Sequence, residues 1–176
     1  YRLEGIVFVI DPAPVPDGDV DTTLEVARRL QSLIEASGGA SIVTRSLSES
    51  QTTPGIRQSR ATVTSATVAI GFDVVADGPG GVIVFSQKSS SSAEIDVLSD
   101  ELAVELAQAL TEVDLDSVVG PVSNYPVLKA SARPATRVRL GSLSDDADVA
   151  SFRDPTWADT IARSLYRALG ERFGAL

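Results

Sequence analysis

The stretch that decides the fold class is Gly5-Ile-Val-Phe-Val-Ile10, which is followed at once by Asp11-Pro-Ala-Pro-Val-Pro-Asp-Gly18. The first part is a short, continuous run of apolar and mostly β-branched residues, typical of a strand that is buried on both faces. The second part is rich in proline and ends the strand as a rigid loop. Strands of this kind occur in parallel sheets that helices cover, so we expect a sheet between two helical layers.

Strand and helix patterns alternate along the rest of the chain. The spacing after Gly18 predicts a helix that starts at a capping box, Thr22 with Glu25, and stops at Gly38-Gly39. Further helices are expected over 56–63, over 93–111 and from Asp154-Pro155 onward, with Asp154 as N-cap. Further strands are expected over 41–44, 67–72, 81–85, 125–129 and 136–140. This order predicts an α/β fold of three layers, in which helices flank a mostly parallel central sheet of about six strands.

Composition and net charge predict the number of domains and exclude some classes of binding partner. We expect a single domain over residues 1–176, excised from a longer protein because the chain starts at Tyr1 and contains no methionine. A net charge of −9 disfavours nucleic acid and anionic membranes as partners. No apolar run reaches the roughly 18–20 residues that cross a bilayer, so we expect no membrane insertion by this segment. The residue usage is typical of the GC-rich genomes of actinobacteria.

The sequence contains neither histidine nor cysteine. The absence of cysteine excludes disulfides. The absence of histidine excludes a serine triad at the serine run 89–92, because no imidazole is available to activate the hydroxyl. The acidic stretch Asp145-Asp146-Ala-Asp148 lacks the pattern of a calcium-binding loop and is interpreted as the start of a helix.

Several short motifs follow one another in a recognisable order. They are Asp11-Pro12 after the first strand, Thr44-Arg45 after the second, Ala69-Ile70-Gly71-Phe72-Asp73, the stretch from Pro134 to Asp145, and Asp154-Pro155 before the closing helix. Taken in order, from Gly5 to the end, they resemble the motifs of the zinc-dependent N-acetylmuramoyl-L-alanine amidases (amidase type 3), which cleave bacterial peptidoglycan. The resemblance implies the three-layer fold of those amidases.

The resemblance also implies where a zinc site would lie, and four of its positions differ in this chain. The two histidine ligands correspond to Pro14 and Gly71, the glutamate ligand lies near Asp19, and the catalytic glutamate corresponds to Arg139. Proline and glycine offer no ligand atom, and arginine has no basic lone pair. We therefore expect a vestigial pocket with no catalytic residue, no bound metal and no cofactor, and the sequence predicts that the chain is not an enzyme but a pseudoenzyme.

Carboxylates are expected close to this vestigial pocket. Asp11 and Asp73 would lie near its mouth, and Arg139 would then replace the charge of zinc by pairing with Asp11, Asp19 or Asp73. The alternative is that Arg139 merely faces solvent from its strand. The same three aspartates leave open a hydrolase that uses magnesium or calcium, since both ions prefer oxygen ligands.

The resemblance implies a role in the bacterial cell wall. We expect a binding or regulatory module in cell-wall synthesis or remodelling, acting through a protein partner of the cell envelope. A peptidoglycan-binding module and a hydrolase with a non-zinc metal are the alternatives. The expected location is extracytoplasmic, in the cell envelope, with an anchor outside this sequence, and a cytoplasmic location is left open.

Overall fold

The computed structural model describes residues 1–16, 20–46, 52–62, 66–88, 92–128 and 133–175. Within these residues the strands form a single six-stranded sheet in the order β2-β1-β3-β6-β4-β5. The strands are β1 (Val7–Pro12), β2 (Ala40–Val43), β3 (Val68–Val75), β4 (Val82–Ser86), β5 (Ser117–Val119) and β6 (Ala135–Ser142). The helices are α1 (Thr22–Ala36), α2 (Pro54–Thr62), α3 (Ala93–Thr111), α4 (Asp146–Phe152) and α5 (Pro155–Phe173).

The sheet is mostly parallel, which confirms the predicted fold class. Strands β2, β1, β3 and β6 run parallel to one another, whereas β4 pairs antiparallel with β6 and β5 pairs parallel with β4. The reversal at β4 follows from its short connection to β3, because a loop of a few residues cannot return the chain to the same end of the sheet. That loop contains Gly81, whose φ of 82° suits the turn.

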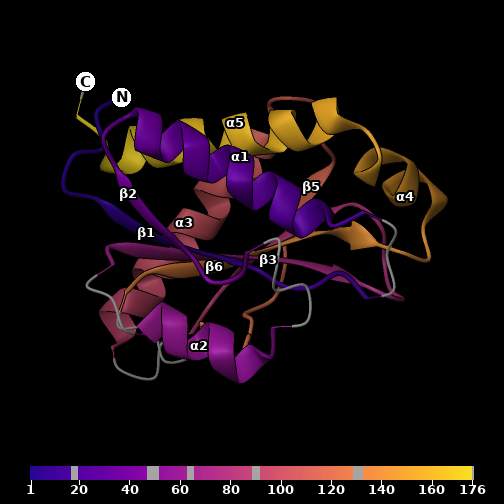
Figure 1. Cartoon of the computed structure of the whole chain (residues 1–176), viewed down its shortest axis with the longest axis horizontal. Helices are drawn as coiled ribbons and strands as arrows, with labels where there is room; N and C mark the ends of the chain where they lie inside the picture. The colour runs from indigo at the N-terminus through magenta and orange to yellow at the C-terminus, as the bar shows by residue number, and fades with distance from the viewer. Residues whose placement is uncertain (17–19, 47–51, 63–65, 89–91, 129–132, 176) are drawn as a thin grey trace.

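The two faces of the sheet are covered unequally. Helices α1, α3 and α5 pack on one face over the main hydrophobic core, which holds side chains such as Phe8, Ile70 and Leu106. Figure 1 shows α2 on the other side of the sheet from α1 and α5. A smaller core lies on the α2 side and consists of Val9, Ala61, Ala69, Tyr125, Val127, Leu128 and Ala135. The sparser cover leaves room for polar side chains on that side.

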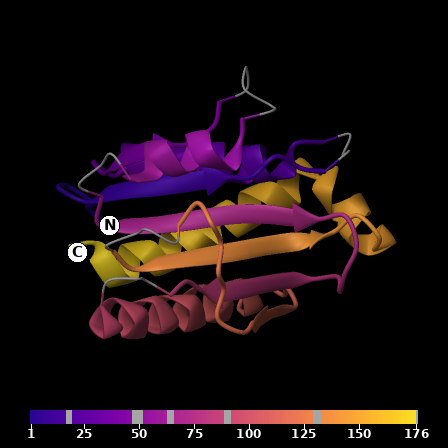
Figure 2. The ribbon, with the colours of Figure 1, turned by 90° about the horizontal axis from the view of Figure 1, so that it is seen from below.

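Residues 120–128, the crossing segment, complete the cover of the α2 side. Figure 2 shows the crossing segment in orange as it passes in front of β4 and β6 toward β3. Backbone and side-chain hydrogen bonds hold it to the end of β4: Ser123 N donates to Ser86 O at 2.7 Å, and Tyr125 N donates to Gln87 Oε1 at 2.8 Å. The side chains of Tyr125, Val127 and Leu128 are then buried against the sheet.

Two sequence-based predictions about local structure are wrong. The expected strand over 125–129 is a turn as far as residue 128, closed by Leu128 N donating to Tyr125 O at 3.1 Å; residue 129 lies outside the described residues. Its apolar residues pack face-on against the sheet instead of pairing at its edge, and the sixth strand is β5. The N-cap of α1 is Asp21 instead of Thr22, because the Asp21 carboxylate accepts the backbone N–H of Leu24 at 3.3 Å.

The ends of the last two helices follow the sequence. Asp154 caps α5 by accepting from Thr156 N at 2.8 Å, and Pro155 occupies the first turn, as predicted. Asp145 caps α4 by accepting from Ala147 N and Asp148 N, so the acidic stretch does start a helix. Among the described residues, no helix is both long and apolar enough to cross a membrane.

Candidate functional site

Polar side chains gather on the α2-facing side of the three central strands. The strand register places Asp11 of β1 beside Gly71 of β3, Gly71 beside Arg137 of β6, and Asp73 beside Arg139. Because every second residue of a strand points to the same face, these five residues lie on one face of the sheet. We call them the sheet site. The structure therefore brings together four of the candidate residues from the sequence analysis, namely Asp11, Gly71, Asp73 and Arg139.

Asp11 is fully buried and its carboxylate is saturated with donors. Thr44 Oγ1 donates to Oδ1, while Arg57 Nη1 and Tyr125 OH each donate to Oδ2 at 2.7 Å. Arg57 Nη1 also donates to the hydroxyl oxygen of Tyr125 at 3.0 Å. Arg57 is only 3% exposed, so the pair forms a buried ion pair whose charges compensate one another.

The protonation states of this cluster follow from its geometry. Burial, reinforced by the charge of Asp11, raises the pKa of the Tyr125 hydroxyl far above its usual value. Burial alone would lower the pKa of the Arg57 guanidinium, but the charge of Asp11 and the contact with Tyr125 raise it overall. Beside Asp11, the cluster therefore keeps a protonated guanidinium and a neutral phenol at every physiological pH.

The second half of the sheet site contains two arginines and one aspartate. Arg137 Nε lies 3.7 Å from Asp73 Oδ1, and Arg139 Nε lies 3.6 Å from Asp73 Oδ2. The guanidinium of Arg137 stacks 4.2 Å from the ring centroid of Phe85, and that of Arg139 lies 5.2 Å from the same ring. The expected ion pair between Arg139 and an aspartate is confirmed, and the alternative in which Arg139 merely faces solvent is wrong.

Burial sets the charge balance of this half. It raises the pKa of the Asp73 carboxyl, although the charges of Arg137 and Arg139 oppose the shift. It also lowers the pKa of the Arg137 guanidinium, against the attraction of Asp73. An arginine remains protonated in a protein, so two cations face a single carboxylate and the group keeps a net positive charge.

Gly71 has little room for a side chain. A Cβ added there would lie 3.0 Å from Tyr125 Cε1 and 3.3 Å from Leu128 Cδ1. The crossing segment therefore occupies the space that a larger residue at position 71 would need. The tyrosine ring that fills this space is the same one whose hydroxyl binds Asp11.

The loop after β1 is held by Arg45, the second residue of the Thr44-Arg45 motif. Arg45 is 1% exposed; its Nε donates to Pro12 O at 2.9 Å, and its Nη2 donates to Asp21 Oδ1 at 2.7 Å. Burial would raise the pKa of the Asp21 carboxyl, but the hydrogen bond and charge of Arg45 hold it below its usual value. Pro14 is partly buried in this loop, and Asp19 lies outside the described residues.

The residues of the sheet site do not fit a catalytic zinc ion. Such an ion takes three protein ligands of the histidine, cysteine or carboxylate type. Among the described residues, no group of three such side chains stands close enough to hold a metal. Asp11 and Asp73 are also poor ligands for magnesium or calcium here, because each carboxylate already faces an arginine.

The sequence analysis missed Arg137 of the sheet site, and it missed three residues that contact the site: Arg57, Phe85 and Tyr125. The signal for Arg137 was present, because it stands two residues before Arg139 on a strand and must share its face. Nothing local marks the other three. They belong to α2, β4 and the crossing segment, and they meet the sheet site only through the tertiary fold.

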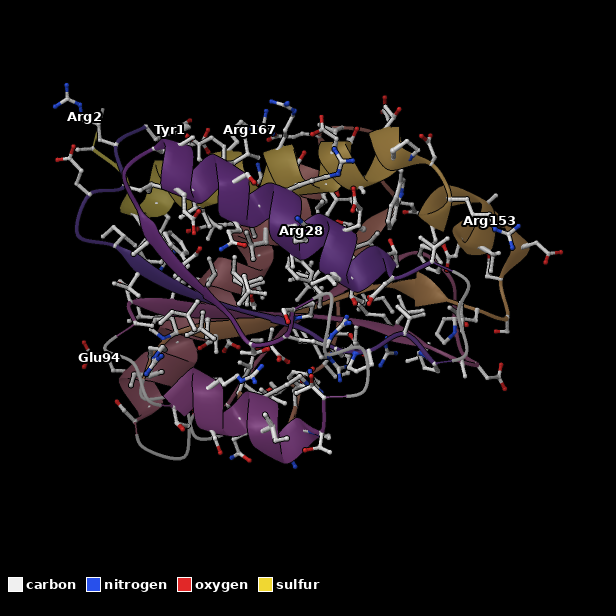
Figure 3. All side chains as sticks on the ribbon, viewed as in Figure 1. Tyr1, Arg2, Arg28, Glu94, Arg153 and Arg167 are labelled. Carbon is white, nitrogen blue, oxygen red and sulfur yellow. The ribbon has the colours of Figure 1, made fainter. Side chains whose placement is uncertain are left out.

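A separate cleft of about 390 Å³ lies between the start of α1 and the junction of α4 and α5. Its lining includes Asp21, Arg28 and Phe152. Figure 3 shows Arg28 on α1 and Arg153, another lining residue, at the end of α4. Helices α1, α4 and α5 contribute its walls, so this cleft does not belong to the sheet site, which lies on the α2 side of the sheet.

Comparisons with known proteins agree with the architecture. A family model described as N-acetylmuramoyl-L-alanine amidase matches residues 18–171. The structure of the amidase Ami1 from Mycobacterium smegmatis is similar over 100% of both chains, with a TM-score of 0.81 and 14% sequence identity. An N-acetylmuramoyl-L-alanine amidase from Clostridium difficile 630 is similar over 96% of both chains, with a TM-score of 0.77 and 17% identity.

A third similar structure contains a partner. The CwlD amidase from Clostridioides difficile, solved in complex with the GerS lipoprotein, has a TM-score of 0.75 and 19% identity, covering 95% of this chain and 98% of its own. At these identities the likeness shows the shared fold. A search of curated protein sequences found no match.

These findings correct the prediction that the chain is not an enzyme. That prediction is wrong, because the matching family model and the similar structures are those of amidases. It weighed only the residues at four positions, Pro14, Asp19, Gly71 and Arg139. The family model instead matches residues 18–171, most of the chain.

Proposed function

Because the chain belongs to the N-acetylmuramoyl-L-alanine amidase family, we propose that it acts in the bacterial cell wall and recognises peptidoglycan at the sheet site. The observation that carries this proposal is the pair of arginines, Arg137 and Arg139, which share the single carboxylate of Asp73. The pair leaves a local positive charge on a protein whose net charge is −9. A local field of this sign attracts anionic groups that the rest of the surface repels.

Peptidoglycan supplies groups that suit this chemistry. Its stem peptides carry free carboxylates, and a guanidinium binds a carboxylate through two parallel hydrogen bonds. The ring of Phe85 lies against both arginines and adds an apolar surface. The proposal places the protein outside the cytoplasmic membrane, where peptidoglycan is accessible.

Sedimentation with purified peptidoglycan sacculi tests this proposal. We expect the protein to sediment with the sacculi, and Arg139→Gln to sediment less. Arg163→Gln is the matched control, because Arg163 lies on α5, is 65% exposed and pairs only with its helix neighbour Asp159 among the described residues. If the unmodified protein stays in the supernatant, or if Arg163→Gln lowers binding as much as Arg139→Gln, the proposal fails.

A second candidate function is binding to a protein of the cell envelope, as in a regulatory module. The observation in its favour is a cluster of exposed valines at the edge of the sheet: Val118 is 54% exposed, Val119 49% and Val122 48%. Strand β5 is the last in the sheet order, and no other strand of the described part of the chain pairs with its outer edge. The complex of CwlD with a lipoprotein shows that one amidase of this fold binds a protein partner.

Site-specific photocrosslinking in the source cells tests the second candidate. A photoreactive residue at position 119 should capture a discrete envelope protein, whereas the same residue at Glu35, an exposed position on α1, should not. Capture of the same proteins from both positions would contradict a docking surface at β5.

A further inference from the structure

We propose that Arg137 and Arg139 form a binding site for a free carboxylate of the peptidoglycan stem peptide. This inference rests on the proposed function and specifies the chemical group that the sheet site recognises. It assigns Arg137 and Arg139 as the residues that contact the ligand and Asp73 as the residue that positions them.

The hydrogen-bonding state of the two arginines supports this site. The Nε atoms of Arg137 and Arg139 lie 3.7 and 3.6 Å from the carboxylate oxygens of Asp73, which is longer than an ordinary hydrogen bond. Both Nε atoms are buried without an acceptor. Buried donors of this kind are costly and nearly always have a partner, so Asp73 alone does not satisfy the two guanidinium groups.

The pair of Asp11 with Arg57 differs in charge balance from the group of Asp73, Arg137 and Arg139. Arg57 is compensated by Asp11, at 2.7 Å, and the cluster is neutral. Arg137 and Arg139 share one carboxylate, so one positive charge has no counterpart. A carboxylate ligand would neutralise this charge and accept charge-assisted hydrogen bonds at the same time.

The arginines are also held in place and reachable. Their side chains are 16% and 18% exposed, so each keeps a path to solvent. The contact of Arg137 with the ring of Phe85, 4.2 Å from Cζ to the ring centroid, holds its guanidinium in place. Because this geometry exists before binding, little side-chain entropy is lost when the ligand arrives.

A pair of matched ligands tests the proposal by isothermal titration calorimetry. One is N-acetylmuramoyl-L-alanyl-D-glutamate with both glutamate carboxyls free, and the other carries both as carboxamides. We expect the protein to bind the free acid at least about tenfold more tightly, the effect of one charge-assisted hydrogen bond. Arg139→Gln and Arg137→Gln should each lose most of this preference, whereas Arg163→Gln should keep it. Arg139→Lys, which retains the charge and loses the planar fork, should reduce the preference several-fold, and circular dichroism checks the fold of each variant.

The outcomes separate this inference from the proposed function. Equal binding of the two ligands, in the protein and in Arg139→Gln, would overturn the carboxylate site and leave peptidoglycan recognition standing. Binding to sacculi with no binding of either soluble ligand would also overturn it. If the protein binds neither the sacculi nor either soluble ligand, the proposed function and this inference are both refuted. If Arg139→Gln does not fold, Arg139→Lys decides, and an unchanged preference in that variant refutes the site.

Discussion

Replacing Arg57 with methionine tests whether the buried ion pair with Asp11 supports the sheet site. Methionine fills a similar volume but leaves the fully buried carboxylate of Asp11 without its cation. Removing one partner of a buried pair typically costs about 3–5 kcal/mol. Asp11 would keep the hydrogen bonds from Thr44 and Tyr125, so we expect the free energy of unfolding to fall by about 3 kcal/mol, near the lower end.

The double variant Arg57→Met with Asp11→Asn isolates the electrostatic part. Asp11→Asn alone leaves the 3%-exposed guanidinium of Arg57 without its anion, so this single variant should also be destabilised. When both charges are removed together, neither is left uncompensated in the interior. We therefore expect the double variant to be more stable than the sum of the two single losses predicts, by about 1 kcal/mol or more.

Urea-induced unfolding at neutral pH measures these differences, with tryptophan fluorescence and circular dichroism as independent probes of two-state behaviour. The control is Arg163→Met, since this exposed arginine should change the free energy of unfolding by no more than about 0.5 kcal/mol. A loss below about 1 kcal/mol in Arg57→Met, or strictly additive losses in the double variant, would refute the view that the pair stabilises the site.

Two further predictions concern Asp21, which pairs with Arg45 beside the loop after β1, and the packing of Tyr125 beside Gly71. Asp21→Asn should cost more than the roughly 1 kcal/mol of a weakened α1 cap, because it also removes the carboxylate that pairs with the buried Arg45. Arg45 holds the pKa of Asp21 below its unfolded value, so the stability that this carboxylate contributes is present above about pH 4 and is lost as the pH falls through its folded pKa. Unfolding curves at several pH values should show a smaller acid-induced loss in the variant, and an identical loss would contradict this role. Gly71→Ala should destabilise by about 1–3 kcal/mol, because the added Cβ would lie 3.0 Å from the ring of Tyr125. A melting temperature unchanged by this substitution would show that the space beside Gly71 is open.

The sequence predicted the scaffold better than the site. The apolar run before Asp11 and the helices over 93–111 and from Pro155 follow local periodicity and capping, which act within a few residues. The segment 125–128 was misjudged because its apolar residues suit either a strand or a turn packed against a sheet. Hydrophobic periodicity in the sequence indicates that a side chain is buried, but it does not indicate which part of the chain the side chain packs against.

Some features of the candidate site could be predicted from the sequence, and others could not. The positions of Asp11, Asp73 and Arg139 on one face, and the ion pair between Asp73 and Arg139, follow from their places along neighbouring strands. The partners Arg57 and Tyr125 do not, because they lie 46 and 114 residues from Asp11 in the chain. A contact across such a separation depends on how the whole chain packs.

The sequence by itself determined the α/β class, the helices that cover the main core, and the identity of the charged residues on the central strands. These features depend on hydrophobic periodicity and helix capping, which neighbouring residues specify. Only the tertiary structure decided that the crossing segment fills the space beside Gly71 and that Arg57 compensates Asp11. It also decided that Arg137 and Arg139 share a single carboxylate. The reason is physical: the energy of a buried charge depends on what surrounds it in space, and distant parts of the chain supply those surroundings.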